Sequence, residues 1–298
     1  MVRKAVIPAA GFGTRMLPAA KAVPKELLPV LDRPTIQYVV EEAADAGVDD
    51  VLLVTSREKR SIEDHFDRTP ELEQRLAAGG KDALLSSVAA LAEKVKVHSV
   101  RQPSQRGLGD AVNQARRHVG NEPFLCLLGD TIFSGAADAL PARQLAEAHR
   151  EFGGSVIGLE EVPPEKVSRY GVVGGSVVRD GVLRLDTLVE KPSPQDAPSR
   201  FAIAARYVLS PAVFDCLDAT PPGKGGEIQL TDALRLLLSR EPVHGLVLRA
   251  RRHDIGNPVD WLRTNLLFAA RDPQTWAALR PLVESLARGG GADGADLP

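Results

Sequence analysis

Phosphate chemistry is indicated first by a glycine-containing loop that follows an apolar run near the start of the chain. Residues 9–25 read A-A-G-F-G-T-R-M-L-P-A-A-K-A-V-P-K. Gly11 and Gly13 leave backbone N–H groups unobstructed, and Arg15 and Lys25 supply positive charge. Free amides and cationic side chains together favour clustered negative charge. The loop therefore predicts a phosphate-binding site.

The loop does not match the two commonest phosphate motifs. Gly11 and Gly13 fit the dinucleotide fingerprint G-x-G-x-x-G, but Met16 stands where its third glycine belongs. The pattern G-x-x-x-x-G-K-[ST] is absent as well. We therefore expect phosphate to be held differently than in a dehydrogenase or a P-loop ATPase.

Two aspartates follow buried strands at positions suited to a metal ion. Asp130 comes directly after the apolar run 124–128, and Asp254 lies where the run 243–248 gives way to a helix. Mg²⁺ prefers one or two carboxylates together with substrate phosphates. A capping or turn role is the competing interpretation of each aspartate. With the glycine loop, the pair predicts a metal–phosphate site.

A lysine and an amide at other strand ends extend this site. Lys191 stands between Glu190 and Pro192 after a strand-like run, and such a fixed point charge could meet a second phosphate. The alternative is a solvated lysine at a hairpin edge. Gln102 follows the run 95–100, and its amide suits the edge of a nucleobase. A plain surface loop is the alternative there.

The elements that must position these residues indicate an α/β protein with a Rossmann-like, mostly parallel mixed sheet flanked by helices. Strands alternating with helices imply a sheet covered on both faces, with its ligand crevice beyond the carboxyl ends of the strands. An antiparallel or mixed region follows, because runs from Val182 to Leu209 are separated by turns. We expect one domain over 1–288 and a disordered tail (289–298).

The expected strands are 2–8, 51–54, 95–100, 124–128, 155–162, 172–178, 182–189 and 203–209. The expected helices begin near 34, 58, 69, 109, 142, 230 and 259.

Composition excludes several classes of function. The 298 residues include 37 basic and 39 acidic side chains, for a net charge of −2, so we expect neither nucleic acid nor a membrane surface as partner. No leader or spanning segment is visible, which predicts a cytoplasmic protein. Cys126 lies in an apolar run and is expected to be a buried hydrophobe. No G-x-S-x-G motif appears and neither cysteine has an activating context, so covalent catalysis is disfavoured.

These motifs jointly resemble the sugar nucleotidyltransferase family, and within it the branch of bacterial UTP–glucose-1-phosphate uridylyltransferases, or UDP-glucose pyrophosphorylases. The resemblance runs from Lys4 to about Leu267. It is carried by A-A-G-F-G-T-R-M-L-P-A-A-K-A-V-P-K-E-L-L-P (9–29), R-Q-P-S-Q-R-G-L-G-D-A (101–111), L-G-D (128–130), R-Y-G-V-V (169–173), V-E-K-P (189–192), A-P-S-R-F-A-I-A-A-R-Y-V-L (197–209), P-G-K-G-G-E-I-Q-L-T-D-A (222–233) and H-D-I-G-N-P (253–258).

The resemblance implies that the domain has a nucleotide-binding half (1–135) and a sugar-binding half (136–288) that contains the antiparallel or mixed region. It also implies a role for each matching position. The nucleoside would be held by Ala10, Gly11, Gln102, Gly107 and Glu26. The triphosphate would be held by Gly13, Thr14, Arg15 and Lys25. Asp130 and Asp254 would bind Mg²⁺. The sugar phosphate would meet Gly171, Glu190, Lys191 and Ala205, and Arg15, Lys25 and Lys191 would be catalytic.

The implied reaction joins UTP and glucose 1-phosphate to give UDP-glucose and pyrophosphate. A sugar-phosphate oxygen would attack the α-phosphorus in line, without a covalent intermediate. Positioning and charge neutralisation would supply the catalysis. A homodimer or homotetramer is expected by analogy.

Three positions depart from the family pattern. Asp110 stands where many relatives have histidine, Ala205 where they usually have glycine, and Gly129 where proline is common in this branch. The sequence shows no benefit of a further carboxylate near phosphates. These departures leave open another pair of substrates, such as dTTP or a different hexose 1-phosphate. A catalytically silent regulatory paralogue is the remaining alternative.

Overall fold

The structure is a computed structural model that describes residues 1–136 and 139–288. The strands of its main sheet are β1 (Lys4–Pro8), β4 (Asp50–Thr55), β5 (Lys96–Arg101), β6 (Phe124–Leu127), β8 (Ser155–Glu161), β9 (Gly171–Arg179), β10 (Val182–Glu190), β11 (Phe201–Leu209) and β12 (Val243–Val247). Within the described residues these nine strands form one sheet in the order β5-β4-β1-β6-β11-β8-β12-β10-β9.

Two short ladders lie outside this sheet. One pairs β2 (Pro29–Val30) with β3 (Arg33–Pro34), and the other pairs β7 (Thr131–Ser134) with β13 (Arg251–Asp254).

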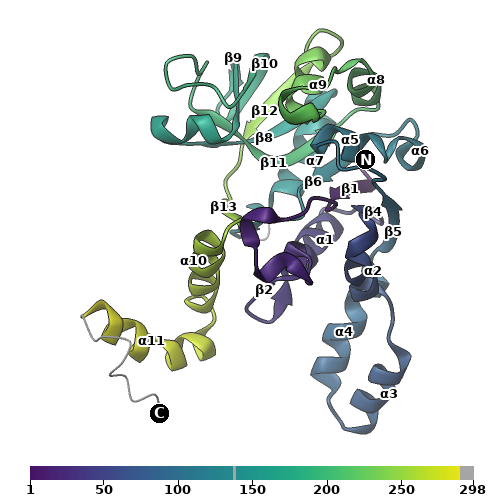
Figure 1. Cartoon of the computed structure of the whole chain (residues 1–298), viewed down its shortest axis with the longest axis vertical. Coiled ribbons are helices and arrows are strands. Elements are labelled where there is room, and N and C mark those ends of the chain that lie inside the picture. Colours follow the sequence, from purple (N-terminus) through teal and green to yellow (C-terminus); the bar gives the residue numbers. More distant parts are fainter. Residues whose placement is uncertain (137–138, 289–298) are drawn as a thin grey trace.

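The helices pack around the sheet and extend beyond it (Figure 1). They are α1 (Thr35–Asp45), α2 (Arg60–Phe66), α3 (Pro70–Ala78), α4 (Asp82–Lys94), α5 (Leu108–Asn113), α6 (Arg116–Val119), α7 (Pro141–Phe152), α8 (Ala212–Ala219), α9 (Leu230–Leu237), α10 (Pro258–Ala269) and α11 (Pro273–Ala287). No helix in the described part of the chain is both long and apolar enough to cross a membrane.

The expected mixed sheet flanked by helices is confirmed. Strand β1 pairs in parallel with β4 and β6, and β4 pairs in parallel with β5. Beyond β6, strand β11 runs antiparallel to both β6 and β8, and β10 runs antiparallel to β9 and β12. The carboxyl ends of β1, β4, β5 and β6 therefore meet at one edge, where the glycine loop, Gln102 and Asp130 begin.

Alternate residues of the central strands enter two hydrophobic clusters, one on each face of the sheet. Val6 and Cys126 join the cluster that includes α5, α8 and α9, whereas Ile7 and Leu125 join the cluster that includes α1, α2 and α7. A strand buried on both faces needs apolar side chains in both directions. This explains the uninterrupted apolar runs of these strands. It also confirms Cys126 as a buried hydrophobe, whose thiol pKa burial raises to about 12.

Some helices differ from the expectation. The single helix predicted from 109 to 119 is divided into α5 and α6, because i→i−3 hydrogen bonds at Gln114 and Ala115 tighten the chain between them. The helical segment predicted from 69 to 93 is a hairpin of α3 and α4. Helices α8 and α11 and the ladder of β7 with β13 were not predicted. The tail from 289 to 298 lies outside the described residues.

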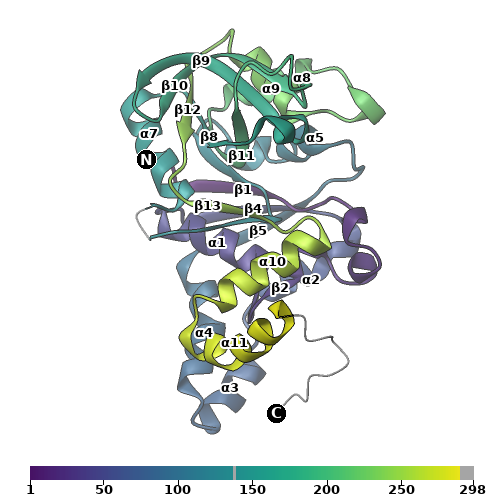
Figure 2. The same cartoon turned by 90° about the vertical axis from the view of Figure 1, so that its left-hand side faces the viewer.

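Two helical pairs reach away from the sheet. The hairpin of α3 and α4 extends on one side, and α10 and α11 extend near the β2–β3 turn (Figures 1 and 2). Helix α10 is fixed there because Trp261 Nε1 donates to the carbonyl of Pro29 at 2.9 Å and Asn265 Oδ1 accepts from the Leu31 amide at 2.9 Å.

A buried ion pair fixes the turn that carries Asp130. Arg206 on β11 is fully buried and binds both carboxylate oxygens of Glu42 on α1. The same guanidinium donates to the carbonyls of Leu128 at 3.3 Å and Thr131 at 2.7 Å, on either side of Asp130. A buried charge is tolerated only when it is paired and hydrogen-bonded. Glu42 therefore supports the arginine that shapes this turn.

Removing Glu42 tests that support. Glu42→Ala leaves Arg206 buried without its counter-charge, so we expect unfolding stability to fall by about 3–5 kcal/mol in urea titrations. Glu161→Ala is the control, because its partner Arg200 and Glu161 itself are both more than half exposed. The control should lose about 0–1 kcal/mol. Equal effects of the two changes would contradict a structural role of the buried pair.

Candidate active site

The ladder of β7 with β13 brings the two predicted metal ligands together. Thr131 pairs with Asp254 in the antiparallel register, and the Ile255 amide donates to the Asp130 carbonyl at 2.9 Å. Asp130 and Asp254 both line a cavity of about 500 Å³. Residues separated by more than a hundred positions thus share one wall of the pocket.

The same pocket joins the two halves of the predicted site. Arg15 enters it from the glycine loop, and the second half contributes Gly171, Glu190, Lys191 and Ala205. Gly171 lies opposite Glu190 in the antiparallel pairing of β9 and β10. A Cβ on Gly171 would lie 3.0 Å from the end of the Ile203 side chain, so a larger residue here would require that side chain to shift. The pocket is therefore lined by cations and carboxylates from both halves.

Lys25 forms an ion pair with Asp130, one of the residues that line this pocket. Lys25 Nζ donates to Asp130 Oδ2. Burial alone would raise the pKa of Asp130, but the charges of Lys25 and Arg15 and the hydrogen bond from Lys25 bring this pKa below its ordinary value. Burial opposes the charge of Lys25 too, but Asp130 and Glu26 raise the pKa of the amine above its ordinary value. Both groups are therefore ionised at neutral pH.

A second ion pair supports the glycine loop from beneath. Lys59 Nζ donates to both oxygens of Glu26, at 2.9 and 2.8 Å, and to the Ala9 carbonyl at 2.6 Å. Burial raises the pKa of Glu26 and lowers that of Lys59, so each group depends on the other for its charged form. No pattern in the sequence indicated Lys59, which lies 33 positions from Glu26 in a polar helical stretch. Glu26 faces the protein and not open solvent.

The glycine loop has the open backbone that phosphate binding requires. Gly13 adopts a left-handed conformation with φ of +65°, and a Cβ there would lie 3.3 Å from the Lys25 side chain. Gly11 has nothing within 4 Å of its Cβ position. Ala10 is buried, and Thr14 lines a neighbouring hollow of about 310 Å³ together with Lys25. The loop and the main pocket are thus connected through Lys25.

Gln102 is fixed at the end of β5. Its side chain is buried, and Nε2 donates to Asp110 Oδ2 at 2.7 Å and to the Gly107 carbonyl at 3.2 Å. Gly107 has a φ of +99°, and a Cβ there would lie 2.8 Å from the Ile228 carbonyl oxygen. The close approach to the Ile228 carbonyl is therefore sufficient to explain why residue 107 is glycine, with or without a ligand beside it.

Two residues of the sugar-phosphate side hold left-handed backbone without being glycine. Lys191 has a φ of +47° and Ala205 a φ of +59°. Such conformations cost of order 1 kcal/mol or more and cluster at functional sites. Lys191 is held by its amide, which donates to the Tyr170 carbonyl at 3.0 Å. Ala205 lies in a stretch where the register of β11 with β8 shifts.

Arg252 is a pocket residue that sequence reasoning missed. Its guanidinium pairs with Glu160 and lies 4.6 Å from the centre of the Tyr170 ring. Burial alone would lower the pKa of Arg252, but Glu160 and Tyr170 raise it, so its charge is secure. Its position directly before His253 and Asp254 was the available signal.

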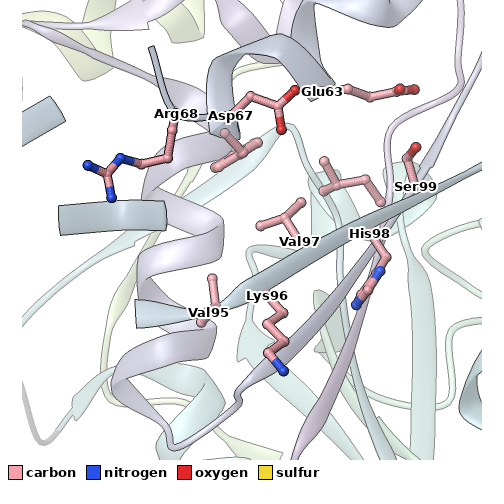
Figure 3. A pocket seen from close by; sticks show the side chains of 10 residues that line it. Glu63, Asp67, Arg68, Val95, Lys96, Val97, His98 and Ser99 are labelled. Atoms are coloured by element: carbon pink, nitrogen blue, oxygen red, sulfur yellow. The ribbon is translucent and has the colours of Figure 1, made fainter. Parts of the chain in front are cut away.

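Another hollow, of about 460 Å³, lies beside β5 and α2 and is separate from these residues (Figure 3). Its lining combines apolar Val95 and Val97 with charged groups such as Glu63, Asp67 and Lys96. None of the predicted site residues lines it. We therefore place the chemistry in the pocket that contains Asp130.

The donor set of the main pocket suits a hard divalent cation. Asp130 and Asp254 supply carboxylate oxygens, which are the ligands that Mg²⁺ prefers, and this ion usually completes its shell with water and substrate phosphates. Among residues 1–136 and 139–288, no three His, Cys, Asp or Glu side chains are placed to enclose a metal by themselves. A cation would therefore bind here together with its phosphate ligand.

Comparisons with known proteins show what the whole chain is similar to. The family model described as nucleotidyl transferase matches residues 4–270. A UTP–glucose-1-phosphate uridylyltransferase of Bacillus subtilis is 46% identical over 285 residues, which are 96% of this chain and 95% of the relative. A UTP-bound UGPase from Acinetobacter baumannii has a TM-score of 0.89 at 36% identity, covering 96% of this chain and 100% of the other. A UDP-glucose pyrophosphorylase complexed with UDP-glucose has a TM-score of 0.85 at 38% identity, covering 91% and 100%.

His253, the residue beside Asp254, should make the stability of the fold depend on pH. His253 is buried, contacts Ser134 Oγ at 2.7 Å, and has its pKa lowered to about 4 by burial and by Arg251 and Arg271. The unfolded chain binds a proton near pH 6.5, whereas the folded chain does so only near 4. The contribution of the neutral His253 ring to the free energy of unfolding is therefore fully present above about pH 6.5. This contribution is lost as the pH falls toward 4.

His253→Gln should weaken this acid dependence, because glutamine keeps a polar contact with Ser134 but does not titrate. Urea midpoints at pH 7.5, 6 and 4.5 would measure it. We expect the wild type to lose more stability than the variant over this range. Parallel losses would contradict the neutral buried imidazole.

Proposed function

The chain belongs to the nucleotidyl transferase family, and from this membership we propose that it transfers the uridylyl group of UTP to glucose 1-phosphate, giving UDP-glucose and pyrophosphate. One observation carries the proposal. A single pocket joins Arg15, Asp130 and Asp254 at one end to Glu190 and Lys191 at the other. Two anionic substrates can therefore lie side by side between groups that offset their charge.

The first end of the pocket suits the triphosphate. In our proposal the open backbone of Gly13 and Thr14 receives phosphate oxygens, and Arg15 and Lys25 supply positive charge. Asp130 and Asp254 would hold a divalent cation, as nucleotidyl transferases generally do, and we propose Mg²⁺. Such an ion neutralises phosphate oxygens and the charge that develops on the leaving pyrophosphate.

Lys25 has two partners available in this scheme. In the free protein it is paired with Asp130, so neither charge is left alone in a half-buried site. The oxygens of a bound triphosphate compete for the same ammonium group. Once Lys25 turns to the phosphate, the carboxylate of Asp130 is free to act as a metal ligand. The ion pair thereby keeps both groups ionised and in place before substrate arrives.

The second end of the pocket suits the sugar phosphate. Lys191 is more than half exposed and contacts Glu190 Oε1 at 3.1 Å. We propose that its ammonium group binds the attacking phosphate, while Glu190 and Gly171 contact sugar hydroxyls and Ala205 closes the wall. A sugar phosphate is already ionised at neutral pH, so its oxygen needs no general base. The displacement then proceeds in line without a covalent intermediate.

The nucleoside is assigned to the edge beside the glycine loop. We propose that the backbone of Ala10 and Gly11 and the side chain of Gln102 contact the base, with Gly107 nearby. Glu26 would act indirectly, since it is paired with Lys59 beneath the loop.

The remaining predictions concern assembly and context. We propose a homodimer or homotetramer, because Val259, Leu262 and Leu266 are exposed at helical spacing on α10, a pattern typical of a contact surface. We also propose that residues 1–288 form one catalytic domain, with the boundary between its two halves near residue 135. A cytoplasmic location stays a prediction.

The direct test of the function is pyrophosphate release from a matrix of nucleoside triphosphates and sugar 1-phosphates, with Mg²⁺ present and absent. We expect UTP with glucose 1-phosphate to be the most active pair, and activity to require the metal. A higher rate with dTTP or another hexose would replace the substrate assignment. No release from any pair would support a binding-only protein.

Lys25 provides a residue-level test. Lys25→Ala should lower kcat by about 100-fold or more, because the charge is needed where negative charge develops. Affinity for UDP-glucose, measured by calorimetry, should change much less. Lys96→Ala is the matched control, since Lys96 is exposed on β5 beside the separate hollow of Figure 3. Wild-type turnover in Lys25→Ala would refute the role.

A further inference from the structure

The amide that faces the base is held by a buried carboxylate with no assigned role. Asp110 lies in the first turn of α5 and is 3% exposed, and Gln102 is 6% exposed at the end of β5. Gln102 Nε2 donates to Asp110 Oδ2 at 2.7 Å and to the Gly107 carbonyl at 3.2 Å. Asp110 Oδ1 accepts from Arg106 Nη2 at 2.7 Å. The carboxylate therefore links an arginine and an amide.

These contacts determine which end of the Gln102 amide points outward. An ionised carboxylate and a backbone carbonyl only accept hydrogen bonds, so the nitrogen of the amide must face them. Both protons of Nε2 are then in use. Within the described part of the chain, Oε1 accepts no hydrogen bond. A half-turn of the amide would place Oε1 against the Asp110 carboxylate and the Gly107 carbonyl, so that acceptors would face one another without a proton between them.

The surrounding backbone leaves Gln102 and Asp110 little freedom to move apart. The backbone N–H of Gln102 donates to the Thr55 carbonyl at 2.9 Å. The Gly109 amide donates to the Ile228 carbonyl at 2.9 Å, which fixes the start of α5. A Cβ on Gly109 would lie 2.8 Å from the same oxygen. The remaining freedom at this position is rotation of the Gln102 side chain, and Asp110 opposes it.

We propose that Asp110 is a positioning residue that sets the base preference of this site, an inference that rests on the proposed uridylyl transfer. By holding Nε2, it leaves Oε1 as an acceptor for a base that carries a proton on N3. Uracil and thymine carry that proton. Cytosine has a lone pair at N3, which Oε1 repels. Asp110 thus favours UTP over CTP and does not separate uracil from thymine.

The negative charge of Asp110 is offset by the guanidinium of Arg106. Arg106 is 62% exposed, so it can follow the carboxylate without being buried itself. This arrangement gives a reason for a carboxylate where the family pattern commonly has histidine.

The test compares kcat/KM for UTP and for CTP with glucose 1-phosphate in Asp110→Ala. Without the carboxylate the amide can turn and offer Nε2 to cytosine N3. We expect the UTP-over-CTP preference to fall by about tenfold, the usual scale of one misdirected hydrogen bond. Asp110→Ser, which is closer in size and imposes no fixed orientation, should show the same loss. Arg106→Ala should keep the wild-type preference, because it removes only the partner of Oδ1.

A double-mutant cycle with Gln102→Ala separates positioning from general damage. If Asp110 acts through Gln102, adding Asp110→Ala to Gln102→Ala should leave the preference unchanged. Folded Asp110→Ala and Asp110→Ser variants that keep the wild-type preference within twofold would overturn the proposal. So would an equal further loss in the Gln102→Ala background. Wild-type protein inactive with UTP would instead contradict the proposed function itself.

Discussion

The site depends on one constraint: its charged groups are partly withdrawn from water, so each must have a partner before any substrate is present. Lys25 with Asp130, and Lys59 with Glu26, meet this need around the glycine loop. Arg206 pairs with Glu42 in the same way next to the turn that carries Asp130. An unpaired charge in such surroundings would change its protonation state or disturb the fold. The pairs therefore connect the stability of the fold with readiness for anionic ligands.

The sequence predicted most strands of the main sheet and several residues that line the pocket for a simple physical reason. Strands buried on both faces are visible as apolar runs, and functional residues of such sheets lie where those runs end. Asp130, Gln102 and Lys191 were proposed as site residues by this rule. The rule does not predict how close the ends of different strands lie to one another. The ladder of β7 with β13 brings Asp130 beside Asp254. Its β13 strand consists of polar and charged residues and has no apolar signal of its own.

Partners that are distant in the chain were beyond prediction. No local pattern indicates that Lys59 pairs with Glu26. Nor does any local pattern indicate that Arg206 supports the turn of Asp130. Asp110 illustrates the same limit in another way. The sequence marked it as a departure near a phosphate site, with no evident benefit, and gave Gln102 both a donor and an acceptor for the base. The fold assigns the donor to Asp110 and Gly107, which leaves only the acceptor.

The central claim is that Lys25 is held by Asp130 until the triphosphate binds and is then transferred to it. A crystal structure of this protein with UTP and Mg²⁺ tests the claim most directly. We predict Lys25 Nζ within hydrogen-bond distance of a phosphate oxygen and no longer in contact with Asp130, whose carboxylate would lie about 2.1 Å from the metal. A triphosphate bound with the Lys25–Asp130 pair intact, and with the metal away from Asp130, would contradict it.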